Sequence, residues 1–475
     1  MIDRLRQDPR FRWEMIVLGC MYIGYAALYM CRKTVVISGP AMLDDPMLGL
    51  TKTAWGAILG WGTAGTVVGK LINGVLADRC GGRRVFIFSL SLCMLATTVF
   101  GTMSGVLFFS IAYFVALFGK SAGWPAMANL IRIWYPQNWR GRIWGIISSS
   151  SRFSSVVTTL GLGSLFLVMS WQGVIATAVA IAGVVLLAII FILKQSPKDA
   201  GLEATAEEKE VEKKPHPLDD FTLSQALLYL AKSPRVWMIC LSISCLTVLF
   251  ELQGFIPIYL KETFGLTAGI AVMTASAFPI GSLISALLGG FVFDVISKRT
   301  RIFVLGGMMV FSVLCLEALL LIPSFGLTNT FALWITLAAI MLFGVAISPC
   351  YYIPMSVFAV DFGGVRCGVL VGIIDAVGYS FAMAFDFIGG AVADQADGWG
   401  QFLTILLAVS AVGAVTLSLF LILEYRADTL EFRDGNRMKN KKTRKWTLRI
   451  SLTTNPKLYD KWGKVYWKLI YSNNE

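Results

Sequence analysis

The sequence predicts an all-α polytopic membrane protein with twelve transmembrane helices, arranged as two pseudosymmetric six-helix bundles. Of its 475 residues, 56% are hydrophobic and only 15% are charged, whereas soluble domains carry charge on about a quarter of their residues. The mean hydropathy is +0.70. The apolar residues form runs of about 20, the length that crosses a bilayer as a helix. A charged segment at residues 194–234 divides these runs into six and six.

The twelve runs define the expected spans in order. They cover residues 14–38, 53–77, 84–104, 107–133, 143–169, 172–193, 236–260, 267–293, 302–322, 330–358, 368–391 and 401–423. The run after Ile143 does not alternate apolar and polar residues, so it is expected to be helix and not a barrel strand. The predicted domains are an N-terminal bundle (1–193), a cytoplasmic linker with a short amphipathic helix (194–234), a C-terminal bundle (235–425) and a basic cytoplasmic tail (426–475).

The loops predict the orientation, because cytoplasmic loops carry an excess of Lys and Arg. One set of loops carries Arg79, Arg83, Arg84, Arg132, Arg140, Arg142, Lys298, Arg299, Arg301 and Arg366. The opposite loops carry only Lys52 and Lys261. The first set is therefore placed in the cytoplasm, together with both termini.

The formal net charge of +12 arises largely from the tail, where Lys and Arg cluster between residues 439 and 449. Anionic lipid of the inner leaflet is one expected partner of this tail, and a solvated tail is the alternative; nucleic acid is not expected. The nine cysteines are scattered without metal-ligand spacing, and the one histidine, His216, lies in the linker. No metal site, cofactor or catalytic constellation is expected, so the chain is not predicted to be an enzyme.

Charged residues inside the apolar runs are sorted by half of the chain. The first half contains Arg32, Lys70, Lys120 and Arg152, and the second contains Glu251, Asp375 and Asp386. Each ionised group at mid-membrane costs about 2.5–3.5 kcal/mol on insertion scales, and such groups usually line a polar pathway or binding site. The pattern therefore indicates a transporter.

A motif after the second span repeats after the eighth. Its first copy contains Gly74, Asp78 and Arg83, and its second contains Gly290, Asp294 and Arg299. The copies are offset by 216 residues (290−74, 294−78 and 299−83). Repeated halves are typical of transporters that alternate access around a shared site.

With Arg79 and Arg84, this motif resembles the signature of the major facilitator superfamily. The resemblance implies a gate in which Asp78 faces the N-terminal dipole of the eleventh helix, supported by Arg83. The predicted gate comprises Gly74, Asp78, Arg79, Arg83, Asp294 and Arg299. Topology anchoring by the arginines is the simpler alternative, and both functions can coexist.

A closer resemblance is to the organophosphate:phosphate antiporters, which carry glycerol-3-phosphate and hexose-6-phosphate. It rests on the helix-1 segment at residues 24–33, on Gly123-Trp124-Pro125 and on Lys70. It implies that Arg32 binds the substrate phosphate, with Lys70 nearby. A guanidinium offers a planar fork of donors that suits phosphate. The other candidate substrate ligands are Lys120, Arg152, Tyr25, Tyr29, Tyr351 and Tyr352.

The second half departs from that family. The relatives have a second arginine on the seventh helix, whereas this chain has no cation near Leu249 and has Glu251 instead. Glu251, Asp375 and Asp386 have three possible roles: binding a proton, meeting a substrate ammonium group, or neutralising Arg32 and Arg152.

The predicted function is secondary transport of a small anionic or zwitterionic metabolite, with an organophosphate favoured, by antiport or proton coupling. A carrier of polycarboxylates, including carboxylate siderophores, is the first alternative. A transporter-like membrane sensor of sugar phosphates is the second. The expected surroundings are a bacterial inner membrane, with the chain as a monomer.

Overall fold

The computed structural model describes residues 8–202, 223–363 and 367–453. The predicted loop residue Arg366, most of the predicted linker with His216, and the end of the basic tail lie outside these ranges. The side chain of Asp294 and those from residue 428 onward are likewise outside the described part. The chain divides into two units, Met1–Phe420 and Leu421–Glu475. The helices discussed below belong to the first unit, except that α18 continues into the second.

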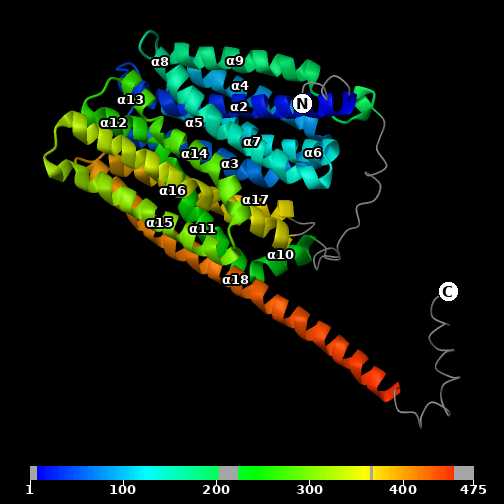
Figure 1. Cartoon of the computed structure of the whole chain (residues 1–475). Helices are drawn as coiled ribbons and strands as arrows, with labels where there is room; N and C mark the ends of the chain where they lie inside the picture. The colour runs from blue at the N-terminus through cyan, green and yellow to red at the C-terminus, as the bar shows by residue number, and fades with distance from the viewer. Residues whose placement is uncertain (1–7, 203–222, 364–366, 454–475) are drawn as a thin grey trace. The chain divides into compact units, whose positions relative to one another are not determined.

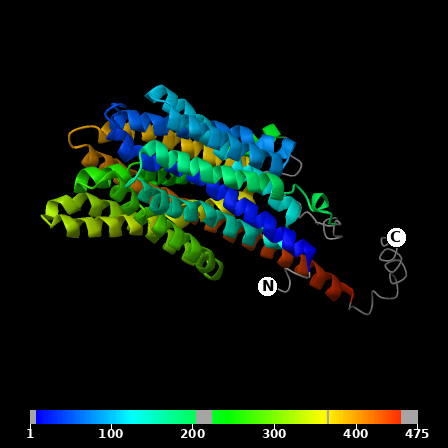
Figure 2. The ribbon, with the colours of Figure 1, turned by 90° about the horizontal axis from the view of Figure 1, so that it is seen from above.

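Each of the twelve predicted spans coincides with helix, and no strand occurs within the described ranges. The first half contains α2 (Pro9–Leu43), α3 (Lys52–Cys80), α4 (Gly82–Thr102), α5 (Val106–Ser121), α6 (Gly123–Trp134), α7 (Gln137–Val157), η1 (Thr158–Leu162), α8 (Gly163–Leu165) and α9 (Trp171–Ile192). The second contains α11 (Pro234–Glu251), η4 (Leu252–Gly254), α12 (Ile256–Phe264), α13 (Ala268–Thr274), α14 (Ala277–Val295), α15 (Lys298–Leu321), η5 (Ile322–Phe325), α16 (Asn329–Gly363), α17 (Cys367–Ala393) and α18 (Gly398–Thr453). Figures 1 and 2 show the helices of the first unit, up to Phe420, running alongside one another. Between the halves lie η2 (Lys198–Ala200) and α10 (Leu223–Lys232), where the short amphipathic helix was predicted.

In the part of the chain that the structure describes, ten helical segments are long and apolar enough to cross a membrane. The two predicted spans without this property are α3, which is rich in glycine, and α7, which carries Ser148, Ser149, Ser150 and Ser151. Both pack against other helices, α3 against α5 and α17, and α7 against α2 and α14. Their lower hydropathy follows from this position, because a helix surrounded by protein does not need an apolar surface all round.

Several spans are interrupted near their centres. Ala122 separates α5 from α6, and a π-helical turn, η1, follows α7. The seventh span breaks directly after Glu251, where α11 gives way to the 3-10 turn η4. Interrupted helices expose backbone groups and often occur at functional sites.

The two halves meet closely along α3 and α17, a contact that we call the seam. A Cβ added at Gly56 would lie 2.6 Å from the Cα of Gly390, and one at Gly60 would lie 2.6 Å from the ring of Phe387. Glycine at these positions allows the two backbones to approach each other. Beyond Lys70, a Cβ added at Gly74 would meet nothing within 4 Å.

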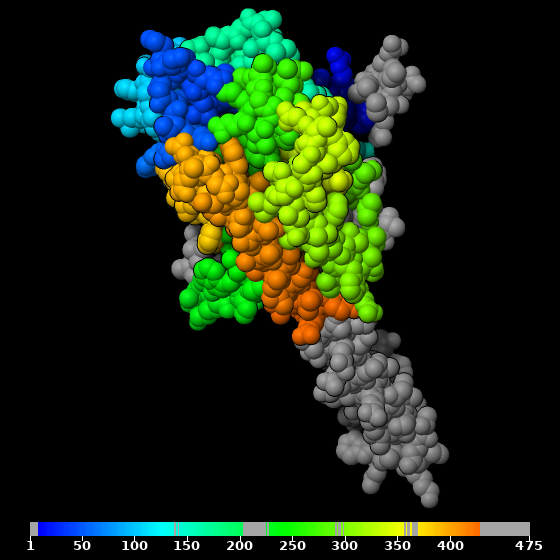
Figure 3. Space-filling model, turned by 90° about the vertical axis from the view of Figure 1, so that its left-hand side faces the viewer, coloured from blue at the N-terminus to red at the C-terminus, as the bar shows by residue number. Residues whose placement is uncertain are grey.

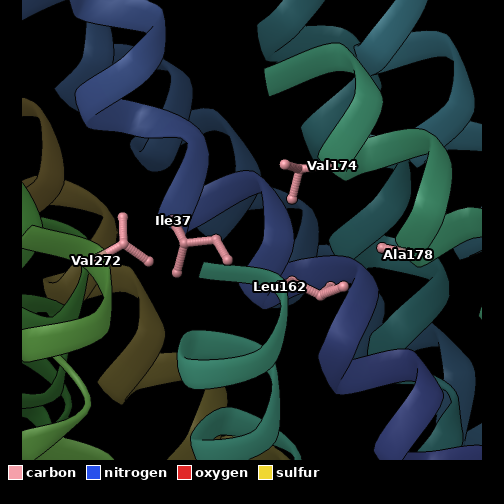
Figure 4. Packing of buried hydrophobic residues seen from close by; sticks show 5 residues of the cluster. All are labelled: Ile37, Leu162, Val174, Ala178 and Val272. Carbon is pink, nitrogen blue, oxygen red and sulfur yellow. The ribbon is translucent and has the colours of Figure 1, made fainter. Parts of the chain in front are cut away.

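We call the end of the helices where α2 ends and α3 begins the distal end. The end where α2 begins and α3 ends is the proximal end. In Figure 1 the distal end, with α8, α12 and α13, lies on the left. A cluster of apolar residues joins the halves there, with Val272 of α13 packed against Ile37, Leu162, Val174 and Ala178 (Figure 4). Figure 3, which looks onto this end, shows blue segments of the first half against green segments of the second.

Candidate functional site

Two polar pairs cross the seam between α3 and α17. The Nζ of Lys70 donates to Oδ2 of Asp375 at 2.5 Å, and Oγ1 of Thr63 donates to Oδ2 of Asp386 at 2.7 Å. Both carboxylates are buried. Each pair joins the first half to the second, so separation of the halves at this level must break it.

A third pair joins α2 to the break in the seventh span. Nη2 of Arg32 lies 3.5 Å from Oε1 of Glu251, the last residue of α11. The side chains are 18% and 10% exposed. The two sequence-predicted residues are thus brought together, and Glu251 neutralises Arg32 and not Arg152 in this arrangement.

Lys120 and Arg152 have no carboxylate within ion-pair distance among the described residues. Nζ of Lys120 lies 4.6 Å from the ring centroid of Tyr29. The guanidinium of Arg152 donates to Oγ of Ser348 at 3.2 Å and to the carbonyl of Ser148 at 3.0 Å. These two cations give the region a surplus of positive charge, which favours an anionic ligand.

The four predicted tyrosines lie around these charges. Tyr25 packs against Tyr29 and Trp124, with ring centroids 5.7 Å apart in both cases. Tyr351 packs against Phe250, with centroids 5.1 Å apart. The ring of Tyr352 faces Arg152 at 5.1 Å, but its hydroxyl donates to the carbonyl of Ala286. That hydroxyl is therefore engaged by α14 in this structure.

Three further residues belong to the same region and were not predicted. Lys33 is buried, and its Nζ donates to Oε1 of Gln253 at 3.4 Å. Tyr113 lies beside Arg32, and the ring of Tyr379 faces Lys70 at 5.9 Å. Lys33 directly follows Arg32, and Tyr379 lies one helical turn after Asp375, so sequence spacing carried a signal for both. Nothing in the sequence distinguished Tyr113.

The predicted gate residues lie at the proximal end. Asp78, Arg79 and Arg299 are exposed, and Asp78 makes no hydrogen bond or ion pair within the described ranges. Arg83 instead binds the end of α9, where its guanidinium donates to the carbonyls of Leu193 at 2.6 Å and Ile190 at 2.8 Å. A cation at a helix C-terminus satisfies orphan carbonyls. No contact of Asp78 with α17 is observed among the described residues, and residues 364–366, directly before α17, lie outside them.

Polar contacts join the halves at the distal end, and we call this set the distal clasp. It consists of Asp44, Lys52, Thr53, Lys261, Glu262 and Asp394. Lys52 pairs with Glu262 at 2.9 Å, and Lys261 pairs with Asp44. In the sequence, Lys52 and Lys261 served only to predict topology, so their pairing was not foreseen.

Asp394, directly after α17, receives the first amides of α3. The amides of Lys52 and Thr53 donate to its carboxylate at 3.3 Å, and Oγ1 of Thr53 donates at 2.7 Å. Burial alone raises the pKa of Asp394, but the hydrogen bonds from Thr53 and from the two amides lower it below its ordinary value. A carboxylate at a helix N-terminus is stabilised by the unpaired amides and the helix dipole.

No group of three or more metal-binding side chains occurs in the part of the chain that the structure describes. The site is highly charged, with five cations from the first half and three carboxylates from the second. Two ion pairs, Arg32–Glu251 and Lys70–Asp375, join the halves. Such an arrangement can bind an anion and can exchange partners when the halves move.

A family profile described as Major Facilitator Superfamily matches residues 21–385, most of the chain. The chain belongs to the Major Facilitator Superfamily. It is accordingly a multi-pass integral membrane protein, and the superfamily fold predicted from the sequence is confirmed.

Among similar proteins is one described as "Probable hexose phosphate transport protein" from Chlamydia trachomatis, 25% identical over 308 residues. That match covers 61% of this chain and 66% of the relative, slightly less than two thirds of its length. "Membrane sensor protein UhpC" of Escherichia coli is 23% identical, with 63% and 70% covered. "Glycerol-3-phosphate transporter" of Bacillus subtilis is 22% identical, with 63% and 69% covered. These relatives agree with the predicted resemblance to the organophosphate:phosphate antiporters.

Solved structures share the fold. A bacterial homologue of the human lysosomal transporter Spinster, in an inward-facing and unoccupied conformation, gives a TM-score of 0.67 at 16% identity. The comparison covers 86% of this chain and 97% of that one. A D-xylose–proton symporter gives a TM-score of 0.63 at 14% identity.

Proposed function

We propose that this protein is a secondary active transporter that moves a small organophosphate across the membrane by alternating access. The observation that carries the proposal is the set of buried charges: ion pairs that join the halves, beside cations that have no carboxylate partner. A phosphate ester carries up to two negative charges and suits a guanidinium fork flanked by ammonium groups. The similarity to proteins described as hexose phosphate and glycerol-3-phosphate transporters supports the same substrate class.

In this proposal Arg32 binds the phosphate, and Lys120, Lys70 and Arg152 contribute positive charge around it. Glu251 competes with the substrate for Arg32. When a phosphate dianion displaces Glu251, Arg32 exchanges one ion pair for another, so little Coulomb energy is lost. The link between α2 and α11 is released at the same time. Binding of the substrate is thereby connected to movement of the halves.

The replacement of a cation by Glu251 on the seventh span also supports a zwitterionic substrate, or coupling to a proton. A polycarboxylate needs the same cations and remains the main alternative substrate class. The resemblance to a membrane sensor supports a second function, in which the protein binds a sugar phosphate and signals to a partner with little flux.

The placement in the cell belongs to the same proposal. The proximal end would face the cytoplasm of a bacterium, with the chain in the inner membrane as a monomer and without enzymatic activity. The excess of Lys and Arg in the proximal loops supports this orientation. Anionic lipid would bind the basic tail.

Uptake by purified full-length protein in liposomes tests the function. We expect labelled glucose 6-phosphate to enter liposomes in a saturable manner, and unlabelled phosphate esters to compete. Binding without flux would favour the sensor. Uptake of a tricarboxylate but of no phosphate ester would favour the alternative substrate class.

A further inference from the structure

Asp386 is the most enclosed of the carboxylates that cross between the halves. It is 0% exposed, and its Oδ2 accepts one hydrogen bond, from Thr63. Its Oδ1 is buried and has no hydrogen-bond partner in the described part of the chain. An ionised carboxylate has about four acceptor positions, so a buried one with a single donor is poorly compensated. The neutral acid fits this environment better.

The charged neighbours of Asp386 lead to the same conclusion. Glu251 of α11, Arg32 of α2 and Tyr113 of α5 are the titratable groups that act on it from the surrounding helices. On α3, Lys70 is already paired with Asp375. Glu251 holds the Arg32 guanidinium at 3.5 Å, and no Lys or Arg among the described residues forms an ion pair with Asp386. Burial without a counterion favours the protonated form of a carboxylate.

The seam separates Asp386 from the distal end. A Cβ added at Gly56 would lie 2.5 Å from the backbone oxygen of Asp386 and 2.6 Å from the Cα of Gly390. Beyond Gly390, the clasp residue Asp394 holds the start of α3. Asp394 is eight residues from Asp386, roughly 12 Å along a helix. Water from the distal side therefore reaches Asp386 only after α3 and α17 separate.

We propose that Asp386 is the proton-binding residue of the transport cycle, and that it exchanges its proton with the distal side only when the distal clasp and the seam open. The proposal rests on the proposed transport function and assigns the coupling ion to one of three candidate carboxylates. On opening, the O–H bond of the acid breaks, the proton passes to water, and a hydrated carboxylate remains. That carboxylate cannot return to the closed seam until it is protonated again, so closure of the distal end requires a proton on Asp386.

Transport measurements separate this proposal from the proposed function. We expect Asp386→Asn, which keeps the shape and stays neutral, to retain exchange of labelled for unlabelled glucose 6-phosphate. We expect it to lose accumulation driven by a pH gradient, falling to the level without a gradient. Retention of gradient-driven accumulation by this variant overturns the proposal, as does a wild-type protein whose accumulation of the ester does not depend on the pH gradient. Absence of all anion exchange in the wild type overturns the proposed function instead.

A conformational readout tests the proposal without transport, and it also serves if Asp386→Asn folds poorly. Spin labels at Met47→Cys and Ser324→Cys, on exposed distal loops of the two halves, report the distal separation in a background without other cysteines. In the parent, raising the pH should enlarge the fraction with long distances, because an ionised Asp386 favours the open seam. The same shift should persist in Glu251→Gln and be absent in Asp386→Asn. An unchanged pH response in Asp386→Asn, or its loss only in Glu251→Gln, contradicts the assignment.

Discussion

Single side chains decide whether the charged region binds an anion or merely holds the halves together. Arg32 is paired with Glu251, whereas Lys120 contacts the Tyr29 ring and Arg152 contacts Ser348. The first cation must change partner to bind a substrate, while the other two are already without a carboxylate. These differences between residues predict different consequences of substitution.

Arg32→Lys should reduce transport at least tenfold, because an ammonium cannot form the two parallel hydrogen bonds of a guanidinium with phosphate. Initial rates in liposomes measure the loss. Arg84→Lys, at an exposed position outside the site, is the matched control and should transport normally. Wild-type rates in Arg32→Lys would remove Arg32 from the substrate site.

Lys70 and Asp375 should stabilise the protein mainly because each neutralises the buried charge of the other. Removing one partner of a buried ion pair costs about 3–5 kcal/mol, whereas removing both costs much less. Lys70→Met and Asp375→Leu alone should each lower the unfolding temperature of the purified protein. The double variant should recover most of that loss. Additive losses in the double variant would show that the two side chains are not coupled.

At the scale of elements, the helix pair α3 and α17 controls the closure of the distal end. Glycines allow the two backbones to touch at Gly56 and Gly390, whereas a Cβ added at Gly74 would meet nothing within 4 Å. The same two helices are joined at the distal end by Asp394 and are expected to be joined at the proximal end by Asp78. A carboxylate near one end of each helix would then meet the N-terminus of the other.

Gly56→Val should prevent closure of the seam, because an added Cβ would lie 2.5 Å from the Asp386 carbonyl oxygen and 2.6 Å from the Gly390 Cα. Spin labels on the distal loops should then show mainly long distances. Gly19→Val on α2 provides the control, since a Cβ there meets nothing within 4 Å. Equal distance distributions in the two variants would mean that the seam does not control closure.

Asp394→Asn should loosen the distal clasp at neutral pH, because the amide lacks the negative charge that the α3 N-terminus stabilises. The sign of the pH effect follows from the lowered pKa of Asp394. Its contribution to closure is present above the ordinary aspartate pKa and is lost as the pH falls through the lowered value. The distal distances should therefore lengthen in Asp394→Asn at neutral pH. A distribution that matches the wild type would exclude Asp394 from the clasp.

The sequence predicted the helices well because bilayer-length apolar runs are a strong signal, and it located α3 and α7 even though both are less apolar. It also identified Arg32, Lys70, Glu251 and Asp375 as candidate site residues, since charge inside an apolar run is rare. The partners of these charges and the distal clasp were not predictable. Pairing depends on which helices of the two halves face each other, and Lys52 or Asp394 near a helix end resembles any other surface residue.

On the scale of the whole molecule, polar contacts join the halves at the distal end, along the seam and around Arg32 and Arg152. The charged region lies between the distal clasp and the proximal end. A substrate that takes Arg32 from Glu251, together with a proton on Asp386, would change the balance between the two ends. Replacement of Glu251 by the substrate at Arg32 would thus link a local ion pair to the movement of the two bundles.

The central claim is that an organophosphate binds at these charges and moves the halves in opposite senses at the two ends. Distances between spin labels test it most directly, with one pair at Met47 and Ser324 and another at Arg84 and Lys232, which are exposed near the proximal end. Adding glucose 6-phosphate should lengthen the distal distances and shorten the proximal ones in the wild type, and should change neither in Arg32→Lys. Distances that stay constant at both ends of the wild type, or that shorten at both, would contradict the account.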